Sequence, residues 1–228
     1  MNFEDPEFLK LYDAGGAKLF IPGYAALHRM TVVRLAERVP EDARILVVGA
    51  GGGFELEAFA RMKPEWRFFA LDPSAGMLEL ARNRIESLAA SHRVDWLQGT
   101  IPEIPRQNFD AATCLFTLHC LPDDGSKLEA LRAIRASLKK GAPFALADNC
   151  IGPGRKQREK LLPRFRDYAV LSGAEPALAE AARQANFEQL KSTGITPRRE
   201  KELLRQAGFR KWDLYYAGLS WRGWLSRA

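Results

Sequence analysis

The feature that most constrains this chain is a run of glycines placed directly behind a short hydrophobic segment. Residues 45–53 are ILVVGAGGG, so that four of the five positions from Gly49 to Gly53 are glycine. The apolar run is typical of a strand that is covered on both faces, and the glycines predict a sharp turn with a bare backbone. Because successive glycines are costly in backbone entropy, the turn indicates that another group approaches it closely.

Strand-like and helix-like segments alternate through much of the chain. The expected parallel strands lie at 44–48, 67–71, 93–97, 109–118 and 144–148. This order predicts an α/β fold, a Rossmann-like doubly wound sheet that binds its ligand outside the carboxyl ends of the strands. The first helix is expected to begin near Pro22, with a buried face marked by Leu27, Met30 and Val33.

A long insertion is expected near the C-terminus. Residues 149–211 far exceed the dozen or so that a crossover connection needs. We expect them to form a helical cap at about 150–195, with helices at 154–172 and 175–190, and then a crossover helix that Thr196 and Pro197 begin and Gly208 ends. The two aromatic runs that follow, joined at Ala217 and Gly218, predict an antiparallel hairpin at the edge of the sheet.

Length and composition favour one domain over residues 1–228. The chain has a mass of 25.6 kDa, and 46% of its residues are hydrophobic. No apolar run approaches the eighteen or so residues of a membrane span, so we expect a soluble, cytoplasmic protein without a membrane partner. Cys114, Cys120 and Cys150 are odd in number and form no CxxC pair, which argues against a disulfide framework and against a metal site.

The net charge of +6 is concentrated in two segments, 155–166 and 198–211. Such basic faces attract phosphates or other anions. They are more typical of a solvated helix surface, because nucleic-acid binders usually cluster bases more densely and add exposed aromatic residues. The charge pattern therefore leaves binding to tRNA open without requiring it.

The glycine turn and one aspartate together predict a nucleoside-type cofactor. A glycine turn between a strand and a helix points backbone N–H groups at an anionic ligand. Asp72 stands 72 − 53 = 19 residues after the last glycine, where an acid can accept hydrogen bonds from ribose hydroxyls. An alternative is that Asp72 only caps a turn before Pro73. Phe54 breaks the dinucleotide fingerprint GxGxxG, and the pattern is instead GxGxG.

This spacing belongs to an ordered set of motifs: ALDPSAGMLELAR, FDAATCLFTLHCLPD and LRAIRASLKKGAPFALAD. Over nearly the whole chain the set resembles the class I S-adenosylmethionine-dependent methyltransferases. The resemblance implies seven mostly parallel strands, the last of them antiparallel, and S-adenosylmethionine as the cofactor. It also implies that Gly49, Ala50 and Gly51 pass the methionine part of the cofactor, with Gly53 as a further binding residue of the same loop. Asp72, followed by Pro73, would bind the ribose. Thr100 and Ile101 would flank the adenine.

The segments FIPGYAAL, DPSAGM and LFTLHCL and the aromatic hairpin are similar to the bacterial carboxy-S-adenosylmethionine synthase group, which acts in wobble-uridine modification of tRNA. By this resemblance Tyr24 and Leu115 would also line the cofactor site. The group uses an arginine in its cap to hold the extra carboxylate of its cofactor, and Arg183 lies near that place in the sequence.

The candidate catalytic residue is His119. It follows the fourth strand at its carboxyl end, where it is placed to act as a general base, although a lone histidine is often structural. Tyr24 has two interpretations, closure over the cofactor or simple packing. Asp148 and three cap residues are placed either to meet a substrate or to serve on helix surfaces: Arg164, Arg166 and Tyr168. Asp110 lies at the wrong edge of the sheet and is expected to be structural.

The main hypothesis is a methyltransferase that moves the sulfonium methyl group to an O, N or C atom of a small molecule. One alternative is an enzyme of tRNA modification, related to the carboxy-S-adenosylmethionine synthases. Another is a non-catalytic protein that binds the cofactor, because Val47 and Thr100 stand where most of the wider family has acids. A nicotinamide oxidoreductase is disfavoured by Phe54. Both a monomer and a homodimer are compatible with the sequence.

Overall fold

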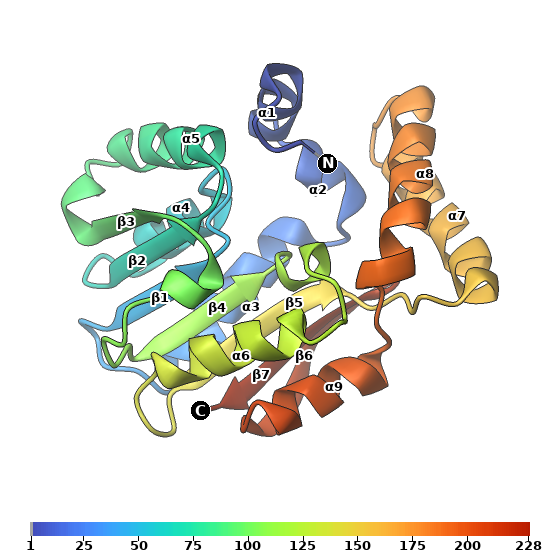
Figure 1. The fold of residues 1–228 in the computed structure, drawn as a ribbon. Coiled ribbons are helices and arrows are strands. Elements are labelled where there is room, and N and C mark those ends of the chain that lie inside the picture. Colours follow the sequence, from blue (N-terminus) through green and yellow to red (C-terminus); the bar gives the residue numbers. More distant parts are fainter. Residues whose placement is uncertain (1) are drawn as a thin grey trace.

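The computed structural model describes residues 2–228 and has seven strands in one sheet, in the order β3-β2-β1-β4-β5-β7-β6. Figure 1 shows the sheet with helices packed on both of its faces. The strands are β1 Arg44–Val48, β2 Arg67–Asp72, β3 Val94–Gln98, β4 Ala111–Leu115, β5 Pro143–Asn149, β6 Arg210–Gly218 and β7 Trp221–Arg227. Strands β1 to β5 pair in parallel, whereas β7 runs antiparallel to both β5 and β6. The expected Rossmann-like sheet with a C-terminal antiparallel hairpin is therefore confirmed.

The helices are α1 Pro6–Asp13, α2 Gly16–Phe20, α3 Tyr24–Ala36, α4 Phe54–Met62, α5 Ala75–Glu86, α6 Ser126–Ala136, α7 Arg155–Leu171, α8 Pro176–Thr193 and α9 Pro197–Gln206. Three short 3-10 turns join them: η1 Ser91–Arg93, η2 Ile101–Glu103 and η3 Leu118–Cys120. Helices α7 and α8 stand together beyond the end of the sheet, as expected for the cap (Figure 1). None of the helices in residues 2–228 is both long and apolar enough to cross a membrane.

Strand β1 shows why the sheet is covered on both sides. Ile45 and Val47 point into a core shared with α3 and α4, whereas Leu46 and Val48 point into a second core shared with α6 and α9. All four side chains are fully buried. The continuous apolar run thus supplies both cores, and it brings the glycine turn to the carboxyl end of the central strand.

Three details of the sequence-based prediction are wrong. The helix expected near Pro22, α3, does begin close to it, at Tyr24, but it is not the first, because α1 and α2 precede it. The fourth strand covers 111–115 instead of 109–118, and the hairpin turns after Gly218, so that Ala217 and Gly218 belong to β6. The crossover helix α9 is capped by Thr196, as expected.

The predicted buried face of α3 is also wrong. Met30 and Val33 are exposed, with 37% and 56% of their surface accessible, and only Leu27 of the expected face is buried. The buried face includes the polar side chains of His28 and Thr31. The Thr31 hydroxyl lies 2.9 Å from the Tyr215 hydroxyl of β6, which satisfies it in the core. A face built partly from polar residues is invisible to a search for apolar spacing.

Candidate active site

The glycine loop connects β1 to α4 through three residues with positive φ: Gly49 at 73°, Gly51 at 51° and Gly53 at 81°. The backbone N–H groups of Gly49 and Ala50 both donate to the carbonyl oxygen of Leu71, at 2.8 and 2.9 Å. These bonds hold the loop against the end of β2. The left-handed φ values explain why glycine is used at these turns.

Close neighbours add a second reason for glycine. A Cβ on Gly49 would lie 2.0 Å from Thr117 Oγ1, and one on Gly53 would lie 2.8 Å from the Cα of Ala81 on α5. The first contact brings the loop against the segment that leads to His119. The second allows α4 and α5 to pack closely. Part of the space beside the glycine backbone is therefore filled by the protein's own residues and is not available to a ligand.

Asp72 ends β2 beneath the loop and is 8% exposed. Its Oδ2 accepts from the Gly51 N–H at 2.8 Å, and its Oδ1 accepts from the Ser74 N–H at 3.0 Å. Burial raises the pKa of this carboxyl group, and the two backbone bonds oppose the shift. Each oxygen keeps a lone pair for a further donor, so the geometry is compatible with ribose binding as well as with a structural turn.

The remaining residues predicted to bind the cofactor differ in burial and in whether their side chains are free to bind it. Ile101 and Leu115 are buried, at 8% and 4% exposure, whereas Pro73 is exposed. Thr100 uses its backbone N–H and its hydroxyl to bind Glu103 Oε2, at 2.6 and 2.8 Å, which caps η2. Its side chain is thus already occupied, and only its position next to Ile101 is left to support a role at the adenine.

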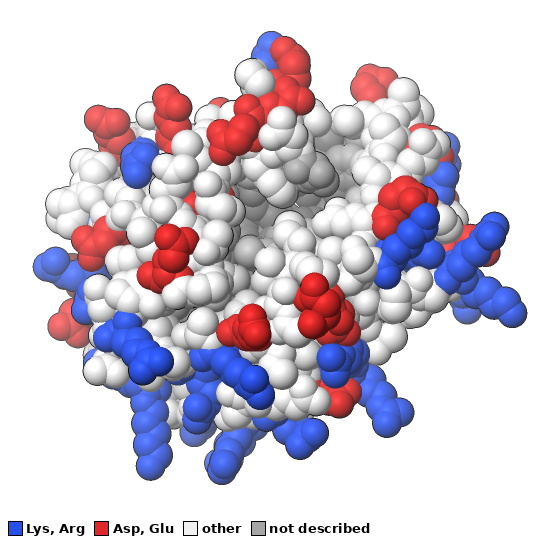
Figure 2. Space-filling view, viewed as in Figure 1, with Lys and Arg blue, Asp and Glu red and all other residues white. Residues whose placement is uncertain are grey.

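Helix α1, which the sequence did not reveal, covers the glycine loop. A Cβ on Gly51 would lie 3.0 Å from the Tyr12 hydroxyl, and one on Gly52 would lie 2.8 Å from the Tyr12 ring. Asp13 pairs with Arg84 of α5 at 2.5 Å. In Figure 1 this helix stands above the carboxyl edge of the sheet. Figure 2 shows the surface hollowed between α1 and the cap, with mostly uncharged atoms along the visible walls.

His119 lies in η3 and its Nδ1 is hydrogen-bonded to Oδ1 of Asp148 at the end of β5. The side chain of Asp148 is 3% exposed and that of His119 is 24% exposed. Burial acts to lower the pKa of His119, but the charges and hydrogen bonds of Asp148 and Cys120 together outweigh it and raise this pKa well above its ordinary value. Because Asp148 occupies Nδ1, Nε2 is the nitrogen that can take a proton from a substrate.

A row of aromatic rings links this pair to the glycine loop. Tyr24 packs edge-on against Phe54 at 6.1 Å and stacks on Phe116 at 5.4 Å. Phe116 meets Trp221 edge-on at 5.3 Å, and Trp221 meets His119 at 5.9 Å. The row supplies an apolar wall along the carboxyl edge of the sheet. Sequence reasoning singled out Tyr24, but neither Phe116 nor Trp221.

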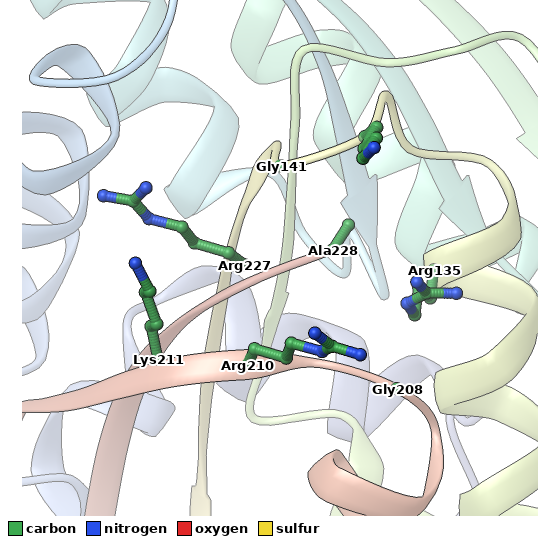
Figure 3. A pocket seen from close by; sticks show the side chains of 8 residues that line it. Arg135, Gly141, Gly208, Arg210, Lys211, Arg227 and Ala228 are labelled. Carbon is green, nitrogen blue, oxygen red and sulfur yellow. The ribbon is translucent and has the colours of Figure 1, made fainter.

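A different cleft lies elsewhere on the molecule. It measures about 450 Å³, and its lining residues include five basic side chains: Arg135, Lys140, Arg210, Lys211 and Arg227. Figure 3 shows Arg135 on α6, and Arg210, Lys211 and Arg227 on the β6–β7 hairpin. The cleft contains none of the predicted site residues.

Comparison with known proteins agrees with this geometry. Residues 46–144 match the family model described as a methyltransferase domain. A carboxy-S-adenosyl-L-methionine synthase from Erwinia tasmaniensis is 27% identical over 200 residues, which cover 86% of this chain and 79% of that protein. A ubiquinone biosynthesis O-methyltransferase from Xanthomonas campestris is 34% identical over 128 residues, 53% of this chain. The chain spans about half of that relative, 51%.

Among solved structures, a SAM-dependent methyltransferase from Aquifex aeolicus has the same fold, with a TM-score of 0.64, 21% identity and 98% coverage of both chains. The fold and the glycine loop define a Rossmann-like protein. The matched domain over residues 46–144 and the relatives show that the chain is similar to the class I S-adenosylmethionine-dependent methyltransferases.

The residues present fit S-adenosylmethionine as the cofactor. Gly49 and Gly51 keep the turn free of side chains, and the buried carboxylate of Asp72 is fixed by backbone N–H groups. S-Adenosylmethionine supplies an electrophilic methyl group when it is bound.

Proposed function

We propose that this protein is a methyltransferase that transfers the methyl group of S-adenosylmethionine to a hydroxyl oxygen of a small, planar molecule. The observation that carries the proposal is the His119–Asp148 pair beside the glycine loop. An alcohol or phenol must lose its proton to become an effective nucleophile, whereas an amine with a free lone pair needs no base. A histidine that a buried carboxylate orients and makes more basic is suited to that task.

His119 and Asp148 act together in one proton transfer. Asp148 holds the imidazole through Nδ1, so that Nε2 accepts the proton of the hydroxyl as the oxygen attacks the methyl carbon. Asp148 then stabilises the imidazolium that forms. The remainder of the rate acceleration comes from positioning, which the glycine loop and the aromatic row provide.

Aromatic surfaces favour a planar acceptor. Phe116 and Trp221 lie between Tyr24 and His119, and in the cap Phe165 stacks on Phe20 of α2 at 5.2 Å. Rings stack on rings with a gain beyond the buried area alone. We therefore assign Tyr24 and Leu115, with the loop residues and Asp72, to the cofactor side, and His119 to the acceptor side.

The test is mass spectrometry of products and of S-adenosylhomocysteine after incubation with S-adenosylmethionine and a panel of planar phenols, catechols and matched anilines. We expect methyl transfer to hydroxyl compounds, and a loss of about 10²–10⁴-fold in His119→Ala. Equal activity of the variant, or transfer to anilines alone, would refute the role of the base.

The synthase relative suggests a second function, the formation of a carboxylated cofactor for tRNA modification. That activity would need a cationic side chain in the cap to hold the extra carboxylate. Arg183 instead makes a two-pronged pair with Glu180 on its own helix, at 2.6 to 3.0 Å. The geometry therefore favours methyl transfer, and calorimetry that compares the plain with the carboxylated cofactor distinguishes the two functions.

The cellular setting is part of the same proposal. The three cysteines are unpaired, and two of them, Cys114 and Cys150, are buried. We propose a cytoplasmic enzyme, active as a monomer or homodimer, which acts on a small molecule in preference to tRNA.

A further inference from the structure

One acidic side chain next to the glycine loop has no role in the chemistry described above. Glu55 lies in the first turn of α4, two residues after Gly53, and is 5% exposed. Its Oε1 is buried and has no hydrogen-bond partner within residues 2–228. A buried carboxyl oxygen without a partner costs stability, so its presence at the start of this helix indicates a compensating function.

Within residues 2–228, no cation acts to hold Glu55 as a carboxylate. Lys18 and Arg84 lie over the ring of the preceding residue, Phe54. Beneath Glu55 lies Thr113 of β4, whose register partner in β1 is Val47.

Three tyrosines lie near enough to Glu55 to respond to its charge: Tyr12 of α1, Tyr24 of α3 and Tyr215 of β6. Cys114 of β4 responds from the opposite face of the sheet, and all four groups are neutral at pH 7. Burial raises the pKa of Glu55 to about 8, so the free protein holds it mainly as the neutral acid at pH 7.

The position of Glu55 links it to the cofactor. Tyr12 covers the glycine loop and Tyr24 packs against the start of α4, and both lie close enough to Glu55 for its charge to raise their pKa values. On the β2 side of the loop, the carboxylate of Asp72 accepts a hydrogen bond from the Gly51 N–H. At the end of β1, the residue two positions before the first glycine is Val47, which has no charge. Glu55 is therefore the acidic residue that follows the glycines most closely, on the α4 side of the loop.

The charge of the cofactor explains why a buried acid is useful beside the glycine loop. S-Adenosylmethionine carries an ammonium and a sulfonium group against one carboxylate, so it enters with a net positive charge. Burial of that charge beside neutral tyrosines is unfavourable unless a negative group faces it. A positive charge nearby lowers the pKa of a carboxyl group, which is the reverse of the effect of burial.

We propose that Glu55 releases its proton to solvent when S-adenosylmethionine binds, and that the resulting carboxylate neutralises the positive charge of the cofactor. This inference rests on the proposed function in one respect, that the glycine loop binds S-adenosylmethionine. It adds a cofactor-binding residue and makes the affinity depend on pH.

The experiment is calorimetric titration of the full chain with S-adenosylmethionine at pH 7, in two buffers with different ionisation enthalpies. With a pKa of about 8, Glu55 is about nine-tenths protonated at pH 7, so we expect release of close to one proton for each cofactor bound. The affinity should rise nearly tenfold for each pH unit between 6 and 7.5.

Glu55→Gln mimics the protonated acid, and it should fold normally, lose the Glu55-dependent proton release and bind roughly ten- to a hundredfold more weakly at pH 7. Glu57→Gln is the matched control on the same helix, because the Glu57 carboxylate is already paired with Arg61 and Arg84 at 3.1 Å. It should behave like the wild type.

Titration with S-adenosylhomocysteine, which keeps the ammonium but lacks the sulfonium, identifies which positive group Glu55 faces. Equal proton release by the wild type and Glu55→Gln would overturn the inference while leaving the cofactor assignment intact. Failure of the wild type to bind S-adenosylmethionine in either buffer would instead overturn the proposed function.

Discussion

The sharpest prediction concerns Asp148→Asn. Asparagine has nearly the same shape, and its amide oxygen can still accept from the N–H of residue 149, a bond that Asp148 Oδ1 makes at 3.0 Å. The substitution removes the negative charge next to His119 while the ring remains surrounded by protein. Burial then opposes only the effect of Cys120, so the pKa of His119 falls from its raised value.

Two consequences follow for catalysis. In the wild type, kcat/KM should rise with pH as His119 loses its proton, with a midpoint well above 6.5. In Asp148→Asn the midpoint should shift to a lower pH, while the maximal rate falls by about 10²–10³-fold because the base is weaker and no longer held in its tautomer.

The assay is formation of S-adenosylhomocysteine from pH 5 to 10 with the best acceptor of the screen. Asp110→Asn is the matched control, since Asp110 lies at the opposite edge of the sheet, where it accepts from the Arg44 N–H and pairs with Lys139. The double variant with His119→Ala should lose no more than His119→Ala alone. A wild-type pH profile and rate in Asp148→Asn would refute the role of the pair.

Further predictions follow from single contacts. Asp72→Ala should weaken cofactor binding by about tenfold or more in calorimetry, because a fixed charged acceptor is lost; unchanged affinity would remove the ribose assignment. Gly53→Ala should cost about 1–3 kcal/mol in chemical denaturation, because the residue has a φ of 81° and the new Cβ meets Ala81. Trp221→Ala should raise KM for a planar acceptor about tenfold, with a much smaller effect on kcat. Burial lowers the pKa of His28 to about 4, so on acidification the unfolded chain takes up the proton before the folded protein does. The free energy of unfolding should therefore fall by about 3 kcal/mol between pH 6.5 and 4. In urea titrations, His28→Phe should abolish that part of the acid sensitivity.

The fold could be predicted from local patterns because each pattern has a single physical cause. The apolar run from Ile45 to Val48 is explained only by a strand covered on both faces, and the glycines after it have positive φ at the carboxyl edge, as the turn requires. Thr196 caps α9 through a bond from the Arg199 N–H at 3.2 Å, another local signal that the sequence carries in full. The predicted buried face of α3 failed because His28 and Thr31 are polar residues within it, and apolar spacing does not register them.

The candidate site also contains residues that local sequence patterns reveal and residues that only the topology of the sheet brings together. The glycine loop is encoded in consecutive residues, and Asp72 lies at a fixed distance from it, so the sequence alone locates both. The pairing of His119 with Asp148 depends on β4 and β5 being neighbours, with Leu115 opposite Ala147 in their register, and Trp221 reaches His119 only because β7 inserts beside β5. Sequence reasoning names both members of the pair but has no means of joining them. The signal that could join them is topological: an acid at the end of the fifth strand and a histidine after the fourth meet wherever those two strands are adjacent at one edge of a parallel sheet.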